Sequence, residues 1–215
     1  MTLLTLLGCY GDLSNAIFEE DARFYAALPS TDAFSFAYPA PELLTEEPAF
    51  FYGLTTKTMG TTSAFLDTVV GATAIVTAVP PAERGEDWRV WGPGAWDAFP
   101  GTYLRMEMSR TSDQSLYTFA FQVADTSAGP WTEFTSGTWQ VDPGTGMQGE
   151  LLFDYDQLSG VVGGADTGQV LARWDAREGR QVEVLADAVV GGTEVALSAS
   201  ILEQAEGGRF EFSEP

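Results

Sequence analysis

The amino-acid sequence predicts a mainly β protein: an antiparallel up-and-down meander that forms a strongly curved sheet or incomplete barrel, with one apolar helix packed in its concavity. Aromatic residues make up 13% of the chain, and such residues favour sheets. From residue 87 onward, apolar and polar residues alternate between closely spaced Gly, Pro and Asp turns, as in strands joined by hairpins. One long apolar segment, residues 61–79, lacks this alternation.

Residues 13–60 are expected to form a helical and loop lead-in. The stretch LSNAIFEEDARFYAALPS offers Ser14 and Asn15 as helix caps, and acidic residues follow in the early turns. Pro29 is expected to end this helix. The stretch YPAPELLTEEP is rich in proline and acid and is therefore predicted to be a loop.

Residues 61–79 are the clearest helix candidate in the sequence. Ser63 can cap the helix, Pro80-Pro81 stops it, and apolar residues cover much of its circumference. A transmembrane span needs about 20 apolar residues, whereas this segment contains Asp67 and several threonines. A buried helix is therefore expected, and its β-branched residues leave a strand as the alternative.

The remaining chain is predicted to form eight or nine strands within one domain that spans residues 61–215. Connections this short force neighbouring strands to be antiparallel. The pairs Glu178-Gly179 and Gly207-Gly208 are expected hairpin turns. A sheet with one apolar face must cover that face, and the segment 61–79 is the predicted cover. An ordinary β-sandwich is the alternative fold.

Composition excludes several classes of function. The net charge is −21, from 31 Asp and Glu against 10 Lys and Arg, so nucleic-acid phosphates and anionic lipid headgroups repel the chain. There is no histidine and one cysteine, Cys9. Catalysis by Ser-His-Asp or Cys-His, His-based metal sites and an internal disulfide are therefore excluded. We expect no cofactor and no enzymatic activity.

Cys9 ends the apolar opening of the chain and is predicted to be a lipid anchor. Leu6-Leu7-Gly8-Cys9 resembles the lipobox of bacterial lipoproteins, in which the cysteine thiol accepts a diacylglyceryl group. The resemblance implies a signal or anchor remnant over residues 1–12, and acyl chains such as palmitate on Cys9. Only eight residues precede Cys9 and none is Lys or Arg; both departures follow if the natural start lies upstream. The alternative is a short apolar segment with a buried cysteine.

The whole chain diffusely resembles uncharacterised predicted lipoproteins of social Gram-negative bacteria. The shared features are the early cysteine, the Ala/Val-rich helix stopped by Pro80-Pro81, the sequence WGP and a Gly-punctuated meander containing GELLFDYD. The resemblance implies attachment to the cell envelope, on the periplasmic side or at the outer-membrane surface, and assigns no catalytic residue. The predicted shape is similar to half-barrel carriers that shelter lipid chains between bacterial membranes, in architecture alone.

Two groups of residues are candidates for ligand binding. Asp142, Asp154 and Asp156 in VDPGTGMQGELLFDYD could supply oxygens to a hard cation such as calcium; the alternative is a hairpin with solvated acids on its outer face. Trp88, Trp91 and Trp96 lie among Gly and Pro loops and could stack a sugar or line a ligand opening. The alternative for these tryptophans is the edge of a core.

The sequence therefore predicts a non-enzymatic envelope lipoprotein with membrane attachment at Cys9. Its curved sheet is expected to bind an apolar small molecule or to serve as a structural or interaction surface for an envelope protein. Two alternatives remain: a carboxylate-based glycan hydrolase and a carbohydrate-binding β module. No motif marks a catalytic carboxylate pair among candidates such as Glu133, Asp154 and Glu183.

Overall fold

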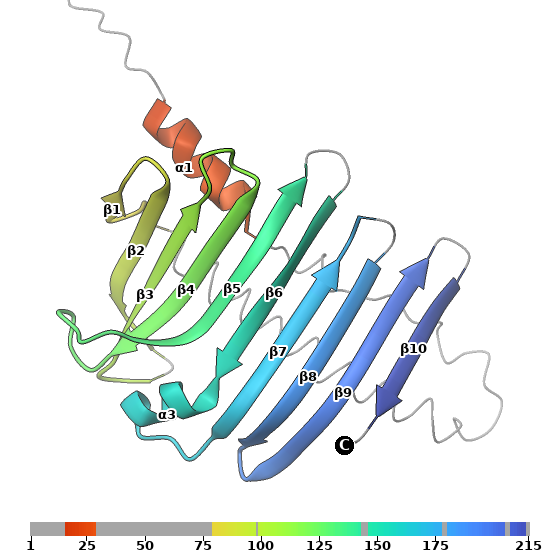
Figure 1. Ribbon diagram of the computed structural model, residues 1–215. Coiled ribbons are helices and arrows are strands. Elements are labelled where there is room, and N and C mark those ends of the chain that lie inside the picture. Colours follow the sequence, from red (N-terminus) through yellow and green to blue (C-terminus); the bar gives the residue numbers. More distant parts are fainter. Residues whose placement is uncertain are drawn as a thin grey trace, which may run out of the picture.

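Ten antiparallel strands follow one another in sequence order within a single sheet (Figure 1). The computed structural model describes residues 16–28, 79–97, 99–142, 146–177, 180–204 and 207–213. The predicted antiparallel meander is confirmed. In these ranges the elements are α1 (Ala16–Ala26), β1 (Glu83–Arg84), β2 (Trp88–Ala95), β3 (Tyr103–Arg110), β4 (Leu116–Ala124), β5 (Thr132–Asp142), β6 (Gly146–Asp154), α3 (Tyr155–Val162), β7 (Thr167–Asp175), β8 (Arg180–Val190), β9 (Thr193–Gln204) and β10 (Gly207–Ser213).

The sheet is neither closed nor strongly curled, so the prediction of a strongly curved sheet or incomplete barrel is wrong. β1 and β10 form its two edges (Figure 1). Curling a sheet requires bulges or kinks at repeated positions along its strands. The ladders contain two register shifts, at Trp91/Gly94 and at Phe121/Gln122, and the pairs from β5 to β10 contain none.

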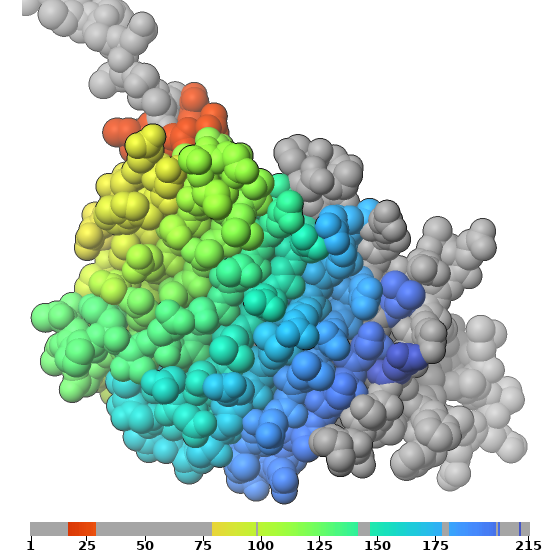
Figure 2. All heavy atoms as spheres, viewed as in Figure 1, coloured from red at the N-terminus to blue at the C-terminus, as the bar shows by residue number. Residues whose placement is uncertain are grey.

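The alternating pattern places apolar and polar side chains on opposite faces of the sheet. On β3, for example, Leu104, Met106 and Met108 are buried, and Arg105 and Glu107 point to the other face. Figure 2 shows the strands following one another across the molecule in colour order from yellow to blue. The buried apolar face continues through Tyr117, Phe119, Phe121, Val123, Trp139, Leu151, Val170, Ala172, Trp174, Val182 and Val184.

The apolar helix predicted at residues 61–79 falls almost entirely outside the described residues. Val79 is its only described position, and this side chain is 53% exposed. The described strands show which surface such a segment would have to cover, because their buried core side chains from β3 to β8 lie on one face.

The lead-in helix is confirmed as α1, which packs against the apolar face at the β2–β4 end of the sheet. Phe24 is completely buried and meets Tyr117 of β4 edge to face, with ring centroids 6.0 Å apart. The Tyr25 hydroxyl accepts a hydrogen bond of 3.1 Å from the indole Nε1 of Trp91 on β2. The predicted caps, Ser14 and Asn15, lie outside the described residues.

Charged side chains fasten α1 to the same end of the sheet. The carboxylate of Asp21 is 5% exposed and lies 2.6 Å from Arg89 Nε and 3.1 Å from Arg84 Nε. At the adjacent residue, Glu20, the carboxylate accepts a 2.8 Å hydrogen bond from Arg110 Nη2, and Arg110 Nε donates to Asp87 at 3.2 Å. Because these partners are up to 90 residues apart in the sequence, the ion pairs fix the helix in its tertiary position.

A second helix, α3, interrupts the pattern where a strand was predicted. The alternation in GELLFDYD was expected to continue through Tyr155 and Asp156, but β6 ends at Asp154. The Asp154 carboxylate accepts a hydrogen bond from the Gln157 N–H and caps α3, which closes with Gly163 in the left-handed conformation. The sequence Asp-x-x-Gln at this position is a capping signal that the period-two pattern concealed.

One predicted hairpin turn is shifted by the observed register. Gly207 and Gly208 were expected to form a turn, but they are the first residues of β10 and pair with Gln204 and Glu203 of β9. Pairing Gly207 with Gln204 leaves residues 205–206 as the connection. The other predicted turn, at residues 178–179, lies outside the described residues.

Candidate binding groove

The three tryptophans predicted to line a ligand site do not share one exposed surface. Trp91 is fully buried on the apolar face, whereas Trp88 lies on the opposite face of β2 and is 38% exposed. Trp96 packs against Phe99 and Phe134, with ring centroids 4.7 and 5.6 Å away. These positions form the edge of a core and offer no common platform for stacking a sugar ring.

The three aspartates predicted as a cation site are not brought together. Asp142 pairs with Gly146, and Asp154 lies eight residues further along β6, about 26 Å away at roughly 3.3 Å per residue. Asp154 caps α3, and Asp156 accepts a 3.1 Å hydrogen bond from the Gly168 N–H. No group of three or more Asp, Glu, Cys or His side chains that could hold a metal occurs among the described residues.

Cys9, the predicted lipid anchor, lies outside the described residues. The helices of the described part of the chain do not include one that is long and apolar enough to cross a membrane.

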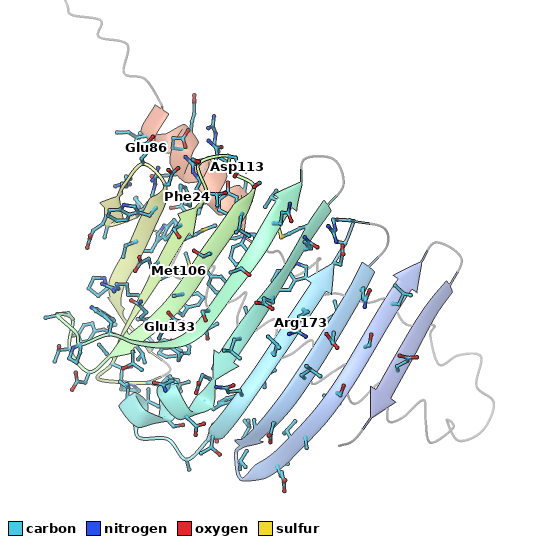
Figure 3. All side chains as sticks on the ribbon, in the orientation of Figure 1. Phe24, Glu86, Met106, Asp113, Glu133 and Arg173 are labelled. Atoms are coloured by element: carbon cyan, nitrogen blue, oxygen red, sulfur yellow. The ribbon has the colours of Figure 1, made fainter. Side chains whose placement is uncertain are left out.

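The polar face of the sheet contains an open groove centred on β4 and β5. Its volume is about 680 Å³, and its lining comes from the five consecutive strands β3 to β7. The floor and rim combine apolar side chains such as Leu152 and Leu171 with hydroxyl and amide groups, which come from Ser109, Thr118, Gln122, Ser136 and Thr138. Figure 3 labels two of the charged lining residues, Glu133 on β5 and Arg173 on β7.

The groove forms because short side chains on the central strands lie between longer ones on the flanking strands. Glu107 on β3 pairs with Ala120 on β4, which pairs with Ser136 on β5, and Ser136 pairs with Leu152 on β6. Ala120 and Ser136 make a low floor, and Glu107 and Leu152 make the walls. Since neighbouring strands lie about 4.8 Å apart, the backbones of the two walls are about 14 Å apart.

The groove carries an excess of negative charge. Its lining contains three carboxylates, from Glu107, Glu133 and Glu150, and one guanidinium, from Arg173. Arg173 is shared between Glu150 at 3.5 Å and Glu183 at 3.3 Å. Among the described residues, Glu107 and Glu133 form no ion pair. The positive charge in the groove is therefore already engaged, and two carboxylates remain for a ligand.

A second cation, Arg105, is fixed beside the groove. Its Nε and Nη2 donate to the Gln122 side-chain carbonyl at 2.8 and 2.5 Å. Its guanidinium also lies 4.8 Å from the ring centroid of Trp131, a cation–π distance. These two contacts hold Arg105 and Gln122 in place at the rim.

A smaller hollow of about 340 Å³ continues the groove along β5 and β6. The two share Thr138, Glu150 and Arg173. In the smaller hollow, Gln148 Nε2 donates to Gln140 Oε1 at 2.7 Å across the strand pair. The polar surface thus extends beyond the groove itself in the direction of the strands.

Sequence reasoning named Glu133 and Glu183 as carboxylates without a motif and did not predict the groove. A weak signal exists in the outward positions of two neighbouring strands, where Thr118 and Ala120 on β4 face Ser136 and Thr138 on β5. Recognising it requires the pairing register, which places these short side chains side by side.

Comparison with known proteins gives no relative from which a function could be transferred. No protein-family model matches the chain, and neither the curated proteins nor the solved structures contain a match.

Proposed function

We propose that this protein is a non-enzymatic lipoprotein of a Gram-negative cell envelope, anchored through Cys9, whose open sheet face is an interaction surface. The observation that carries the proposal is the polar groove on β3–β7. A hollow of this size on an exposed sheet face, in which hydroxyl, amide and carboxylate groups lie among apolar side chains, suits a partner that offers both polar and apolar groups.

Within the same proposal, residues 61–79 form the apolar helix that covers the opposite face of the sheet. That face carries a continuous set of buried apolar side chains from β3 to β8, and such a surface requires an apolar cover. The polar face then remains free for a partner, and any apolar ligand would have to enter between the cover and the sheet.

The three groove glutamates are spread over β3, β5 and β6. Glu107 and Glu133 lie two strands apart, on either side of β4. They are also offset by two residues along the strands, because Glu107 pairs with Ala120 and Glu133 pairs with Gln122. Strand geometry separates the backbones of the three groove glutamates by about 12 to 16 Å.

Glu150 and Glu183 lie closer together, but Arg173 stands between them and contacts both carboxylates. An intervening guanidinium occupies the space that a substrate and its attacking water would need. This pair is therefore better described as a surface ion-pair network than as a hydrolytic site.

The position of α1 supports an anchor at Cys9. Six residues lie between Cys9 and Ala16, the first residue of α1, and the seven Cα–Cα steps span at most about 25 Å when fully extended. Since ion pairs fasten α1 to β2 and β3, a lipid on Cys9 would hold this end of the sheet close to the membrane.

The anchor is tested by mass spectrometry of the mature N-terminus after expression from the natural gene start in a Gram-negative host. We expect a mature chain that begins at Cys9 and carries acyl groups, and a Cys9→Ser variant without them. An unmodified chain that retains Met1 would overturn the anchor.

The interaction surface is tested in the same cells with a photo-crosslinking amino acid. When this amino acid replaces Thr138, which lies inside the groove, we expect a discrete adduct with the partner. When the same amino acid replaces Gln181, an exposed position on β8 away from the groove, we expect no adduct. No adduct at either position, or equal adducts at both, would argue against the groove as the contact surface.

A further inference from the structure

We infer that the groove binds an extended, basic peptide segment of a partner protein, an inference that rests on the proposed function. Charge is the first reason. The chain as a whole carries a net charge of −21, which attracts cations over a long range. Within the groove, Glu107 and Glu133 have no ion-pair partner among the described residues, so they can receive lysine or arginine side chains directly.

The second reason is the distance between these two carboxylates. Their backbones are two strands apart and offset by two residues along the strands, which gives a distance of about 12 Å by strand geometry. In an extended chain, residues four apart lie on the same side and are separated by about 13 Å. A segment with basic residues at positions i and i+4 therefore matches the spacing of Glu107 and Glu133.

The rest of the lining is suited to the other parts of such a segment. Leu152 and Leu171 line the groove and are only half-buried, so the aliphatic stems of lysine or arginine can pack on them. Ser136 and Thr138 on the floor and Gln122 at the rim can donate to or accept from a peptide backbone. The groove therefore offers contacts both to the charged side-chain ends and to the backbone of the peptide.

Other classes of ligand fit this lining less well. A sugar ring needs an exposed aromatic face to stack on, whereas Phe119, the one aromatic residue among the described residues that line the groove, is 5% exposed. A nucleic acid would bring its phosphates toward three carboxylates and would be repelled. An apolar ligand would leave the carboxylates without a partner.

Isothermal titration of the full chain with synthetic peptides tests this inference. The probe is a strand-forming peptide whose only charged side chains are two lysines four residues apart, compared with a peptide of the same composition whose lysines are adjacent. We expect the first peptide to bind several-fold more tightly. Raising the NaCl concentration from 20 to 300 mM should weaken binding, because the contacts are ionic.

Variants locate the binding site. Glu107→Gln with Glu133→Gln is expected to weaken binding of the first peptide at least about fivefold, since two solvent-accessible ion pairs are lost. The matched control, Glu83→Gln with Glu194→Gln, removes two charges from exposed positions outside the groove and should change affinity less than twofold. Ser136→Gln raises the floor without changing charge and should also weaken binding.

Equal weakening by both charge variants would show that overall charge, and not the groove, attracts the peptide. Equal affinity for spermine would overturn the assignment to a peptide, as would the absence of measurable binding at 20 mM NaCl. These outcomes are separate from the anchor test: unmodified Cys9 would overturn the anchor and leave the peptide result unchanged. Failure of the peptide to bind would overturn the partner class and leave the anchor in place.

Discussion

Asp21 is the most deeply buried carboxylate in the network that holds α1. Taken as whole residues, Asp21 and its main partner, Arg89, are each 4% exposed. A buried ion pair adds little net stability, but removing one partner leaves the other charge buried and uncompensated. Arg89 also lies 4.6 Å from the ring centroid of Phe24, so the guanidinium cannot reach solvent without disturbing the core.

Replacing Asp21 by Ala is therefore expected to lower the free energy of unfolding by about 3–5 kcal/mol, measured by urea denaturation. Arg84→Ala is the matched control, because Arg84 contacts the same carboxylate from a side chain that is 33% exposed. Its loss should be less than half as large. Equal losses would show that burial of Arg89 does not determine the effect.

Gly168 occupies a position on β7 that no other residue can adopt without strain. Its φ is 88°, and an added Cβ would lie 2.1 Å from the Asp187 carbonyl oxygen on β8. Gly160 is a contrasting glycine inside α3, where an added Cβ would meet nothing within 4 Å. Comparing alanine substitutions at the two positions therefore distinguishes a glycine that is required by its backbone conformation and close contacts from one that only lowers helix stability.

Gly168→Ala is expected to destabilise the protein by more than about 2 kcal/mol, from backbone strain and the clash. Gly160→Ala should stabilise it by up to about 1 kcal/mol, since alanine favours a helix interior. Thermal unfolding of both variants checks the pair. A stabilising Gly168→Ala would mean that β7 and β8 do not approach as closely as described.

At the scale of elements, α3 depends on one side chain at its start. Asp154 accepts hydrogen bonds from the Gln157 N–H at 3.0 Å and from Gln169 Nε2 on β7 at 2.8 Å. It therefore ends β6, begins α3 and ties both to the next strand. This triple role explains why an alternating strand pattern gives way to a helix at this residue.

Asp154→Ala should lower the free energy of unfolding by about 1 kcal/mol, the usual cost of removing a helix N-cap. Asp154→Asn should retain most of the stability, because asparagine caps a helix equally well. The measurement is urea denaturation monitored by circular dichroism. A loss of the same size in both variants would indicate that the negative charge, rather than the cap, is what matters.

The docking of α1 should be sensitive to acid through Glu20. The hydrogen bond from Arg110 holds the pKa of the Glu20 carboxyl below its usual value of 4.5. The unfolded chain therefore takes up this proton more readily than the folded protein does. The contribution of this contact to stability is complete above pH about 4.5 and is lost as the pH falls through the lower folded pKa.

We expect Glu20→Gln to be less stable than the wild type at neutral pH, with a difference that shrinks as the pH falls below about 4.5. Urea denaturation between pH 7 and pH 3 measures this difference. Glu19→Gln is the control, because Glu19 is an exposed neighbour on the same helix. A difference for Glu20→Gln that stays constant down to pH 3 would contradict the assigned contact.

At the scale of the whole molecule, local patterns determined more of the fold than of the site. Strand alternation and short turns predicted the antiparallel meander, because each residue of a strand takes its face from its neighbours. The curvature of the sheet could not be predicted in this way. It depends on register shifts such as the one at Phe121/Gln122, and a register shift produces no periodic pattern in the sequence. Asp154 shows a third case, where a capping signal and a strand signal overlap.

The groove escaped prediction for a related reason. Ala120 and Ser136 lie 16 residues apart in the chain and become neighbours only through the β4–β5 register. Conversely, Trp88, Trp91 and Trp96 are close in the sequence but are separated in space, since Trp88 and Trp91 point to opposite faces of β2. Sequence proximity therefore suggested a site at the tryptophans, and tertiary pairing created one elsewhere.

The overall charge gives a final prediction for the whole molecule. With 31 acidic and 10 basic residues, self-repulsion opposes the compact state at neutral pH. Salt should relieve it, since the screening length falls from about 30 Å at 0.01 M to about 10 Å at 0.1 M. The buried pair of Asp21 and Arg89 should be screened much less.

We therefore expect the melting temperature at pH 7.5 to rise by several degrees between 10 and 200 mM NaCl; for a chain of this length about 2–4 °C corresponds to 1 kcal/mol. Near pH 4.1, the isoelectric point indicated by the sequence, the net charge is close to zero and the rise should disappear. Differential scanning calorimetry at both pH values measures the effect. A rise of equal size at pH 4.1 would indicate that a specific ion binds, because repulsion is absent at that pH. A fall in melting temperature at pH 7.5 would mean that the surface ion pairs stabilise the fold by more than the excess negative charge destabilises it.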